Sequence, residues 1–277
     1  MIRVSVPAST ANLGAGFDTL GLALSLRLEA GLVDSKQPAN ANTCEDHHPA
    51  SVAFKKNGGS GAIWSHDRIP MGRGLGFSGA ARVAGALLAI AQREGAVVAN
   101  SLEARMAAFR VASELEGHPD NAAASALGGL TVAATGRAIR VPIAVYAEII
   151  VWVPSNSTST KESRTKLSAS VSLDDAVYNL SRSSLLVAAM VTGDVAALYD
   201  ATHDKLHQDV RLAVVPETKR AIHMALDAGA WAAWLSGSGP TMACIVDPAR
   251  AAHVAASLPA GGTVHRLRID ESGPVAS

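Results

Sequence analysis

The chain has 277 residues, of which 48% are hydrophobic and 17% are charged, and its formal net charge is zero. This composition can bury a substantial core, and the length suits one large domain or two smaller ones. A neutral chain with 4% aromatic residues lacks the basic surface and the stacking side chains that general nucleic-acid binders use, so we expect no nucleic-acid partner.

The sequence shows no sign of secretion or of membrane insertion. No run of 18 apolar residues occurs, and the first residues lack a basic segment followed by an apolar run. The two cysteines, Cys44 and Cys244, cannot build a disulfide framework and have no metal-ligand spacing. We therefore expect a cytoplasmic protein with reduced thiols and no membrane partner.

The N-terminal part begins with two predicted strands, over about 2–7 and 20–33, because apolar and polar residues alternate there. Between them, Gly14 and Gly16 favour a tight turn, and Asn12 and Asp18 can project from it. Ordinary capping of the turn by Asn and Asp is the alternative interpretation. The polar residues that follow the second strand, 34–62, indicate a surface loop around a short helix near 50–56.

A glycine-rich stretch then leads directly into a long helical pattern from Ala80 to Glu94. It consists of Pro70, Met71, Gly72, Arg73, Gly74, Leu75, Gly76, Phe77, Ser78, Gly79 and Ala80. Glycines let the backbone approach a ligand closely, and a helix start offers free N–H groups and the positive end of a dipole, so the stretch predicts phosphate binding. A plain tight turn before a buried helix is the alternative.

Two other glycine motifs fit this stretch poorly. The classical P-loop needs a Gly-Lys pair before Ser or Thr, and the chain contains no such pair. The letters Gly74 to Gly79 match the dinucleotide pattern, but no clear strand precedes them, and the next acid, Glu94, closes the helix itself. We keep a dinucleotide oxidoreductase only as a minor alternative.

The region after this helix carries a dense group of polar side chains. Helices are predicted over about 101–114 and 121–127, with a strand over 130–135 after Gly128-Gly129. Five polar side chains lie at the junction of the two helices: Glu114, Glu116, His118, Asp120 and Asn121. A helix end followed by an Asp or Asn N-cap is the alternative to a functional cluster.

The second half begins at a predicted strand over 145–153, so we divide the chain into domains 1–143 and 144–277. Further helices are expected over 174–191, 194–207, 216–229 and 248–257, and further strands over 231–235, 242–247 and 263–270. Helices and strands mix without regular βαβ alternation, which favours an α+β fold in two layers. A glycine-rich segment over 235–241 reads as either a hairpin or part of a site.

Four segments in this order, at 7–22, 70–81, 114–129 and 235–241, closely resemble the GHMP small-molecule kinases. The opening motif resembles the branch of that family that acts on L-homoserine. The resemblance implies a GHMP kinase-like N-terminal domain and a ferredoxin-like α+β C-terminal domain. It also implies ATP and Mg²⁺ as cofactors, phosphorylation of L-homoserine on the route to threonine, and a homodimer as the usual assembly of the family.

The resemblance assigns roles on the ATP side. The glycine stretch from Pro70 to Ala80 would wrap the phosphates, and Ser78 and Glu114 would hold Mg²⁺, a hard ion that prefers oxygen ligands. Asn121 and Thr160 would lie near the reacting hydroxyl. The hydroxyl proton would pass directly to the phosphoryl oxygen, or Asp120 would act as the base.

On the substrate side, an amino acid needs a carboxylate for its ammonium group and a guanidinium for its carboxylate. Asp18 matches the family position for the ammonium group, with three further groups nearby, and two arginines match the positions for the carboxylate. These residues are Asn12, His118 and Asp120 beside Asp18, with Arg164 and Arg211. A kinase for another small alcohol and a non-catalytic ligand sensor on the same fold remain the alternative functions.

The glycine stretch departs from the usual family pattern Gly-Leu-Gly-Ser-Ser-Ala-Ala at two positions. Phe77 replaces the first serine and Gly79 replaces an alanine. If the Phe77 ring turns into the core, we expect the loop to keep its function. If the ring turns into the phosphate cavity, ATP binding suffers.

Overall fold

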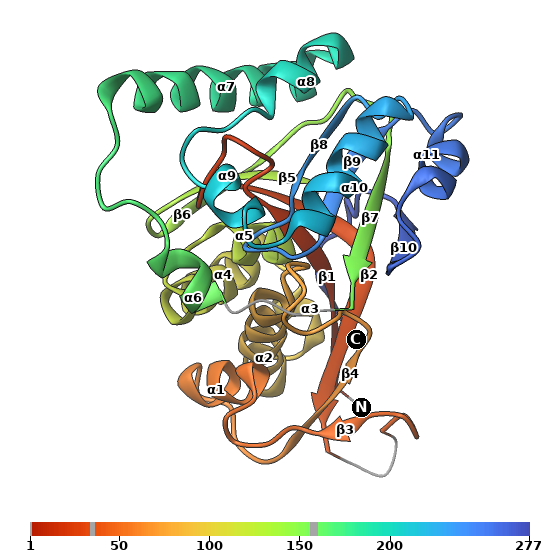
Figure 1. Cartoon of the computed structure of the whole chain (residues 1–277). Coiled ribbons are helices and arrows are strands. Elements are labelled where there is room, and N and C mark those ends of the chain that lie inside the picture. Colours follow the sequence, from red (N-terminus) through yellow and green to blue (C-terminus); the bar gives the residue numbers. More distant parts are fainter. Residues whose placement is uncertain (1, 34–36, 156–159) are drawn as a thin grey trace.

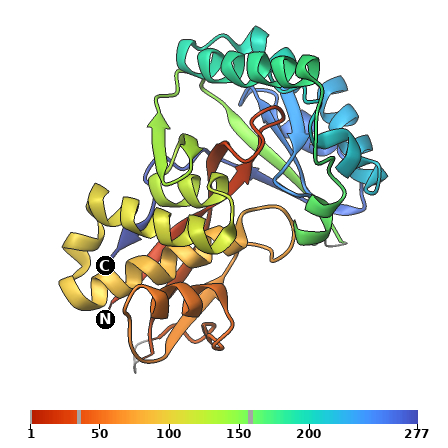
Figure 2. The ribbon, with the colours of Figure 1, turned by 90° about the vertical axis from the view of Figure 1, so that its left-hand side faces the viewer.

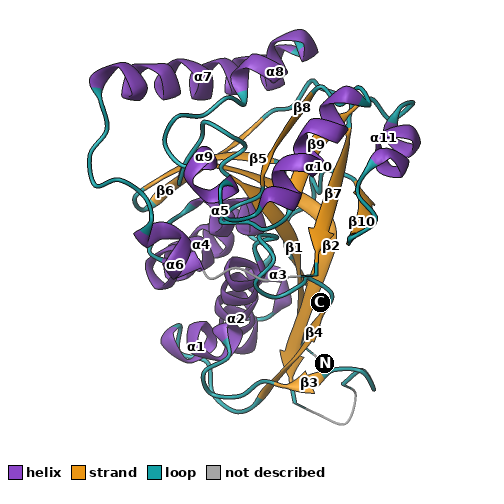
Figure 3. Ribbon diagram, viewed as in Figure 1, coloured by secondary structure: helices purple, strands orange, loops and turns teal. Residues whose placement is uncertain are grey.

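The computed structural model describes residues 2–33, 37–155 and 160–277, and the side chains of 160–162 lie outside this description. Two antiparallel sheets and the helices packed on them form the molecule (Figures 1 and 3). This arrangement confirms the expected α+β class. None of the described helices is long and apolar enough to cross a membrane.

The first sheet has strands in the order β11-β1-β2-β4-β3, and β5 pairs with both β2 and β6. Its strands are β1 (Arg3–Ala11), β2 (Leu20–Leu32), β3 (Asn42–Thr43), β4 (Ile63–Asp67), β5 (Leu130–Ala134), β6 (Arg137–Val141) and β11 (Val275–Ala276). Five helices accompany it: α1 (Pro49–Lys56), α2 (Phe77–Glu94), α3 (Ala96–Ala99), α4 (Leu102–Glu116) and α5 (Asp120–Leu127).

Helix α2 is the centre of the N-terminal core because nearly all of its side chains are small or apolar. Its residues from Ala80 to Ala91 are buried except for Arg82. The absence of a side chain at Gly85 lets α1 cross closely, since a Cβ there would lie 2.0 Å from the Ala50 carbonyl oxygen. The buried helix fixes the glycine stretch, which ends where α2 begins.

The second sheet has the order β10-β7-β9-β8 and is formed by β7 (Glu148–Pro154), β8 (Ala232–Leu235), β9 (Met242–Val246) and β10 (Gly262–Leu267). Helices α10 (Pro216–Asp227) and α11 (Ala251–Ser257) pack against it. When the four strands are numbered 1 to 4 in chain order, they lie side by side in the order 4-1-3-2, which is the expected ferredoxin-like arrangement. The remaining elements are α6 (Thr160–Thr165), α7 (Leu173–Thr192), η1 (Val195–Ala197), α8 (Leu198–Ala201) and α9 (Gln208–Leu212).

Helix α7 lies at the far end of the molecule from α1 in both views (Figures 1 and 2). The ends of the chain lie together, because β11 pairs with β1. The C-terminal tail therefore returns to the first sheet, although the sequence assigned it to a second domain that runs to 277. The sheets themselves do separate close to the predicted boundary, since β6 ends at Val141 and β7 begins at Glu148.

The prediction of a continuous helix over 194–207 is wrong. Helix α8 ends at Ala201, and the Asp204 carboxylate accepts hydrogen bonds from the backbone N–H groups of His207 and Gln208, at 2.8 and 2.7 Å. These two bonds start a new short helix, α9. The break redirects the chain so that Arg211 of α9 enters the cavity described below.

Candidate active site

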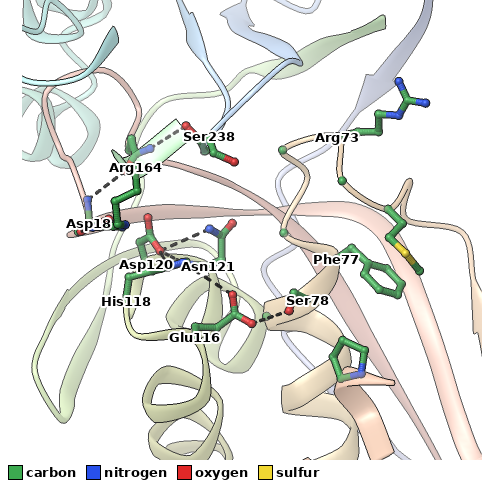
Figure 4. Close-up of a pocket in the computed structure, with 18 of the residues that line it drawn as sticks. Asp18, Arg73, Phe77, Ser78, Glu116, His118, Asp120, Asn121, Arg164 and Ser238 are labelled. Carbon is green, nitrogen blue, oxygen red and sulfur yellow. Dashed lines mark hydrogen bonds and ion pairs between the residues drawn. The ribbon is translucent and has the colours of Figure 1, made fainter. Parts of the chain in front are cut away.

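One cavity of about 280 Å³ brings together all four motif segments that the sequence analysis singled out. It is lined by the glycine stretch, by the turn after β1, by the start of α5, by Arg164 and Arg211, and by the loop between β8 and β9. Figure 4 shows several of these side chains directed toward one another. Segments far apart in the chain therefore meet at a single site.

The glycine stretch owes its path to backbone that only glycine adopts easily. Gly72, Gly74 and Gly76 have φ values of 66°, 77° and 70°, in the left-handed region. A Cβ on Gly74 would lie 2.4 Å from the Ser236 carbonyl oxygen, and one on Gly76 would lie 2.0 Å from Ser9 Oγ. Two of the three glycines are thus required by close packing as well as by conformation.

The neighbours of this stretch hold its carbonyl groups. Ser236 Oγ donates to the Gly74 carbonyl at 2.6 Å, and the Ser9 N–H donates to the Leu75 carbonyl at 3.2 Å. These bonds occupy acceptors of the stretch with protein partners. Helix α2 begins immediately afterwards, at Phe77, so its first N–H groups lie at the cavity.

The two departures from the family pattern both have a structural reason. The Phe77 side chain is 6% exposed and packs edge-on against His48, with ring centroids 5.8 Å apart. Figure 4 shows its ring directed away from Ser78 and Glu116. Gly79 lets α5 approach α2, because a Cβ there would lie 3.2 Å from the Asn121 Cβ. Phe77 therefore takes the first of the two expected positions, in the core.

The prediction that Glu114 lies beside Ser78 is wrong. Glu114 is on the outer side of α4, where its carboxylate is 69% exposed and pairs with Lys56 at 2.6 Å. Two residues later, at a different angle on the helix, Glu116 faces the cavity and accepts a hydrogen bond from Ser78 Oγ at 2.6 Å. The Glu116 carboxylate is 9% exposed and also pairs with Arg82 of α2.

Asp120 connects the polar residues at the start of α5. Its Oδ1 accepts hydrogen bonds from the Asn121 backbone N–H at 2.8 Å, and it lies 2.9 Å from His118 Nδ1. The Asn121 side chain is held from the other side, because Ser9 Oγ donates to its Oδ1 at 2.9 Å. Asp120 is 2% exposed, so its carboxylate is nearly closed to solvent although it lines the cavity.

The turn after β1 presents Asp18 to the same cavity. Asn12 and Asp18 have φ values of 70° and 55°, which Asn and Asp tolerate better than other residues with side chains. Asn12 is 3% exposed and ties the turn together, because its Oδ1 accepts from the Asp18 N–H and its Nδ2 donates to the Gly237 carbonyl. Asn12 thus lines the cavity while it shapes the turn.

Asp18 makes a two-bond ion pair with Arg164 of α6. Arg164 Nη1 and Nη2 each donate to one Asp18 oxygen, both at 2.7 Å. This hydrogen bonding raises the pKa of Arg164. The structure therefore brings together two residues that were predicted to bind opposite ends of a substrate, and it joins them to each other.

Arg211 occupies a different environment. It is 4% exposed, and its Nη1 lies 3.2 Å from His207 Nδ1 and 3.3 Å from the Gly237 carbonyl oxygen. Burial lowers its pKa, and the nearby positive charge of Arg164 adds to this effect. The Phe17 ring lies beside both guanidinium groups, 5.3 Å from Arg164 and 5.2 Å from Arg211.

The hydrogen bonds of the His207 ring show which of its two nitrogens carries the hydrogen. Its Nε2 lies 2.8 Å from the Gly14 carbonyl oxygen, which can only accept, so Nε2 carries the hydrogen. Burial lowers the pKa of His207, which favours the neutral ring. Nδ1 is then free to accept from Arg211, and the ring stacks on Phe17 with centroids 5.0 Å apart.

Sequence reasoning placed Glu116 in the polar cluster but gave it no role, and it missed Phe17 and His207, which contact the arginines of the site. The sequence did offer a signal for Glu116, because this residue directly precedes Gly117 and lies closer than Glu114 to His118. Phe17 and His207 had no local signal. Thr160 begins α6, but its side chain lies outside the described residues, so its predicted role near the hydroxyl is not tested.

Comparisons with known proteins agree with this architecture. The family model described as "GHMP kinases N terminal domain" matches residues 46–129, and "GHMP kinases C terminal" matches 186–263. The curated homoserine kinase of Desulfitobacterium hafniense is 36% identical over 96% of this chain and 94% of its own length. That of Moorella thermoacetica is 38% identical over 87% of this chain and 86% of its own length.

Solved structures show the same fold. The crystal structure of homoserine kinase from Cytophaga hutchinsonii superposes with a TM-score of 0.84 at 23% identity, covering 100% of this chain and 97% of the other. The mevalonate kinase of Methanococcus jannaschii superposes with a TM-score of 0.68 at 11% identity, covering 97% and 98%. At these identities the superpositions show the fold and not the substrate.

Proposed function

Since the chain belongs to the homoserine kinase family of GHMP kinases, we propose that it transfers the γ-phosphoryl group of ATP to the side-chain hydroxyl of L-homoserine. The products are ADP and O-phospho-L-homoserine, an intermediate on the route to threonine. The observation that carries the proposal is the single cavity in which the glycine stretch faces Asp18, Arg164 and Arg211. It combines groups for a polyphosphate with groups for an amino acid.

The ATP side is formed mainly by backbone. The carbonyl groups of Gly74 and Leu75 are occupied by Ser236 and Ser9, and the first N–H groups of α2 lie at the cavity. Phosphoryl transfer depends on positioning and on stabilisation of negative charge more than on covalent chemistry. Backbone N–H groups at the positive end of a long helix supply both without side-chain motion.

Ser78 and Glu116 are the candidate ligands of Mg²⁺. They fit this ion, because their oxygens lie 2.6 Å apart at the mouth of α2 and oxygen is the ligand that Mg²⁺ prefers. When bound, the ion offsets negative charge on the ATP phosphates. Arg82 pairs with Glu116 and so helps to hold this carboxylate beside the cavity.

The amino-acid side suits a zwitterion. The polar atoms of Asp18, His118 and Asp120 lie within 4.8 Å of one another, a concentration of acceptors that suits an ammonium group. Arg164 and Arg211 both line the cavity and can each offer a planar fork to a carboxylate. A neutral sugar or a hydroxy acid would leave part of this set without a partner.

We assign Asn121 the role of orienting the reacting hydroxyl. Its amide is held by Asp120 and Ser9, and it lies between the glycine stretch and the acidic cluster. Asp120 Oδ1 already serves His118 and Asn121, so we assign Asp120 a positioning role and let the hydroxyl proton pass to the transferred phosphoryl oxygen. If Asp120 were the base, Asp120→Asn would remove the acidic limb of the kcat profile against pH.

The other functions considered for this fold fit less well. A non-catalytic sensor was motivated by Phe77, but the ring lies in the core and leaves Ser78 and Glu116 at the cavity. A kinase for another small alcohol would have no use for Asp18 opposite two arginines. We place the protein in the cytoplasm and expect a homodimer, which the exposed apolar side chains of Leu173, Val177 and Leu180 on α7 support.

A coupled assay of ADP release tests the proposed function. Purified protein with Mg²⁺ and ATP is offered L-homoserine, L-threonine, L-serine, mevalonate and pantoate in parallel. We expect kcat/KM for homoserine to exceed each of the others by about 100-fold, since a site built for a buried polar group rejects analogues that leave it unpaired. Light scattering of the same preparation tests the dimer.

A further inference from the structure

The amino-acid side of the cavity is closed by its own charges. Both oxygens of Asp18 are bonded to Arg164, at 2.7 Å each, although both side chains line the cavity. A carboxylate of a ligand cannot use the same face of the Arg164 guanidinium while Asp18 holds it. An ammonium group likewise meets an Asp18 whose charge is already compensated.

The two arginines of the site differ in this respect. Arg211 is anchored by His207 and by the Gly237 carbonyl, neither of which carries a negative charge. Its positive charge is therefore available to a ligand without the loss of an ion pair. The edge of Arg164 formed by Nη1 and Nη2 becomes available to a ligand carboxylate only if its bonds to Asp18 are broken.

We propose that the Asp18–Arg164 pair is an exchange gate that selects zwitterionic substrates. An amino acid breaks the ion pair but gives each residue a new partner of opposite charge, because its ammonium group replaces Arg164 at Asp18 and its carboxylate replaces Asp18 at Arg164. This inference rests on the proposed function and goes beyond it, since it assigns selectivity to a contact within the protein rather than to the sum of two ligand contacts.

Charge balance explains why other alcohols are rejected. A substrate with a carboxylate alone restores Arg164 but leaves Asp18 without a partner in a cavity shared with Asp120, which is 2% exposed. A substrate with an ammonium group alone leaves Arg164 unpaired next to Arg211. In each case the substrate breaks the ion pair between Asp18 and Arg164 but provides a new partner for only one of the two residues. The other charge stays uncompensated in a partly buried site, which is energetically unfavourable.

The gate predicts that loss of one partner improves a substrate that lacks the matching group. In Asp18→Asn, Arg164 is released, so 4-hydroxybutanoate, which is homoserine without its amino group, should gain about 10-fold in kcat/KM. L-Homoserine should lose about 100-fold in the same variant. Asparagine suits the left-handed backbone of this position, where φ is 55°, so the turn should survive.

The reciprocal variant tests the other half of the gate. Arg164→Gln releases Asp18, so 3-aminopropan-1-ol, which is homoserine without its carboxylate, should gain about 10-fold while homoserine loses activity. Either variant alone can decide the question if the other fails to fold, as judged from its thermal unfolding.

The pair between Arg266 and Glu148 supplies a matched control. It also has two bonds, at 2.9 Å each, and its side chains are 45% and 23% exposed, against 41% and 29% for Arg164 and Asp18. It joins β10 to β7 and does not line the cavity. Glu148→Gln should leave the relative rates with all three alcohols unchanged.

The outcomes separate the gate from the proposed function. If the wild-type protein phosphorylates homoserine and each truncated alcohol gains only in its matching variant, the gate is supported. If homoserine is a good substrate but neither truncated alcohol gains in its matching variant, Asp18 and Arg164 act as independent binding groups and the gate is wrong. If the wild-type protein does not phosphorylate homoserine, the proposed function itself fails.

Discussion

The two ends of the cavity are held in place by different means. The phosphate end is formed by backbone groups. They belong to the glycine stretch, whose carbonyls are hydrogen-bonded to the protein, and to the first turn of the buried helix α2. The amino-acid end is charge: Asp18 and Arg164 from distant parts of the chain, bonded to each other. The first end is ready before a ligand arrives, whereas the second must exchange partners.

The difference teaches that one cavity can combine tolerance with discrimination. Every nucleoside triphosphate carries the same phosphates, so a fixed backbone cradle suffices for that end. Small alcohols differ from one another by single charged groups, and an ion pair that must be replaced responds to each of those groups. The variants below are expected to affect one end and spare the other.

The largest effect is expected at the phosphate end from Glu116. Glu116→Gln should lower kcat by about 1000-fold, because it removes a charged oxygen beside Ser78 where charge on the phosphates must be offset. Glu114→Gln is the matched control on the same helix and should stay within about twofold, since its carboxylate is 69% exposed. Steady-state kinetics of both variants measure this.

The reverse ranking of the two glutamates would contradict the account. Because Glu116 also pairs with Arg82, its loss leaves a partly buried cation unpaired, and the unfolding midpoint of each variant must be measured beside its activity. Ser78→Ala tests the proposed metal site a second time without removing the partner of Arg82.

At the amino-acid end, Arg211→Ala should raise KM for homoserine by about 100-fold and leave KM for ATP nearly unchanged. Arg211 is buried, feels the charges of Asp18 and Asp120, and makes no hydrogen bond to the start of α2 among the described contacts, so we expect its loss to remove a carboxylate partner. Initial-rate measurements with each substrate varied separately check this. Equal losses for both substrates would remove Arg211 from the substrate end.

The same contrast explains how far the sequence could be interpreted. The glycine stretch was predictable because its function is local: three left-handed glycines followed by a helix. Asp18, Arg164 and Arg211 were found only through resemblance, and their mutual contacts were not foreseen, because an ion pair across 146 positions has no local pattern.

The errors in the sequence predictions share a physical cause, because each depends on tertiary contacts that the local sequence does not show. Glu114 and Glu116 are the same residue type two positions apart, and only the rotation of α4 decides which one faces the cavity. The sequence predicted a continuous helix over 194–207, but the Asp204 carboxylate accepts hydrogen bonds from two backbone N–H groups, and a separate helix, α9, begins there. The strand β11 is too short to be recognised without its partner β1.

A smaller effect, on stability rather than activity, is expected from Phe77. Phe77→Ser restores the hydroxyl of the usual family pattern but empties a core position that is 6% exposed, which should lower the free energy of unfolding by about 3 kcal/mol. KM for ATP should change by less than about threefold, because a ring packed in the core does not screen the phosphates. Urea unfolding and ATP kinetics test both statements.

A gain in ATP affinity of more than about tenfold with unchanged stability would show that the ring obstructs the phosphate end, contrary to the structure. Phe77→Leu serves as the control, since it keeps an apolar side chain in the core and adds no hydroxyl.

The smallest effect concerns His207 and pH. Burial holds the pKa of His207 below its ordinary value of 6.5, so the folded chain stays neutral there while the unfolded chain takes up a proton. Stability from this group is therefore present above pH 6.5 and lost as the pH falls below that value. His207→Gln should reduce the decrease in the unfolding free energy between pH 7.5 and 5.5, and parallel curves for both proteins would argue against a neutral His207.

The most direct test of the central claim is the rate of ADP release by wild-type protein with Mg²⁺ and ATP, measured against L-homoserine, 4-hydroxybutanoate and 3-aminopropan-1-ol. The account predicts rapid turnover of homoserine and rates about 100-fold or more lower for the two alcohols that each lack one charged group. Comparable rates for all three, or no turnover of homoserine, would contradict it.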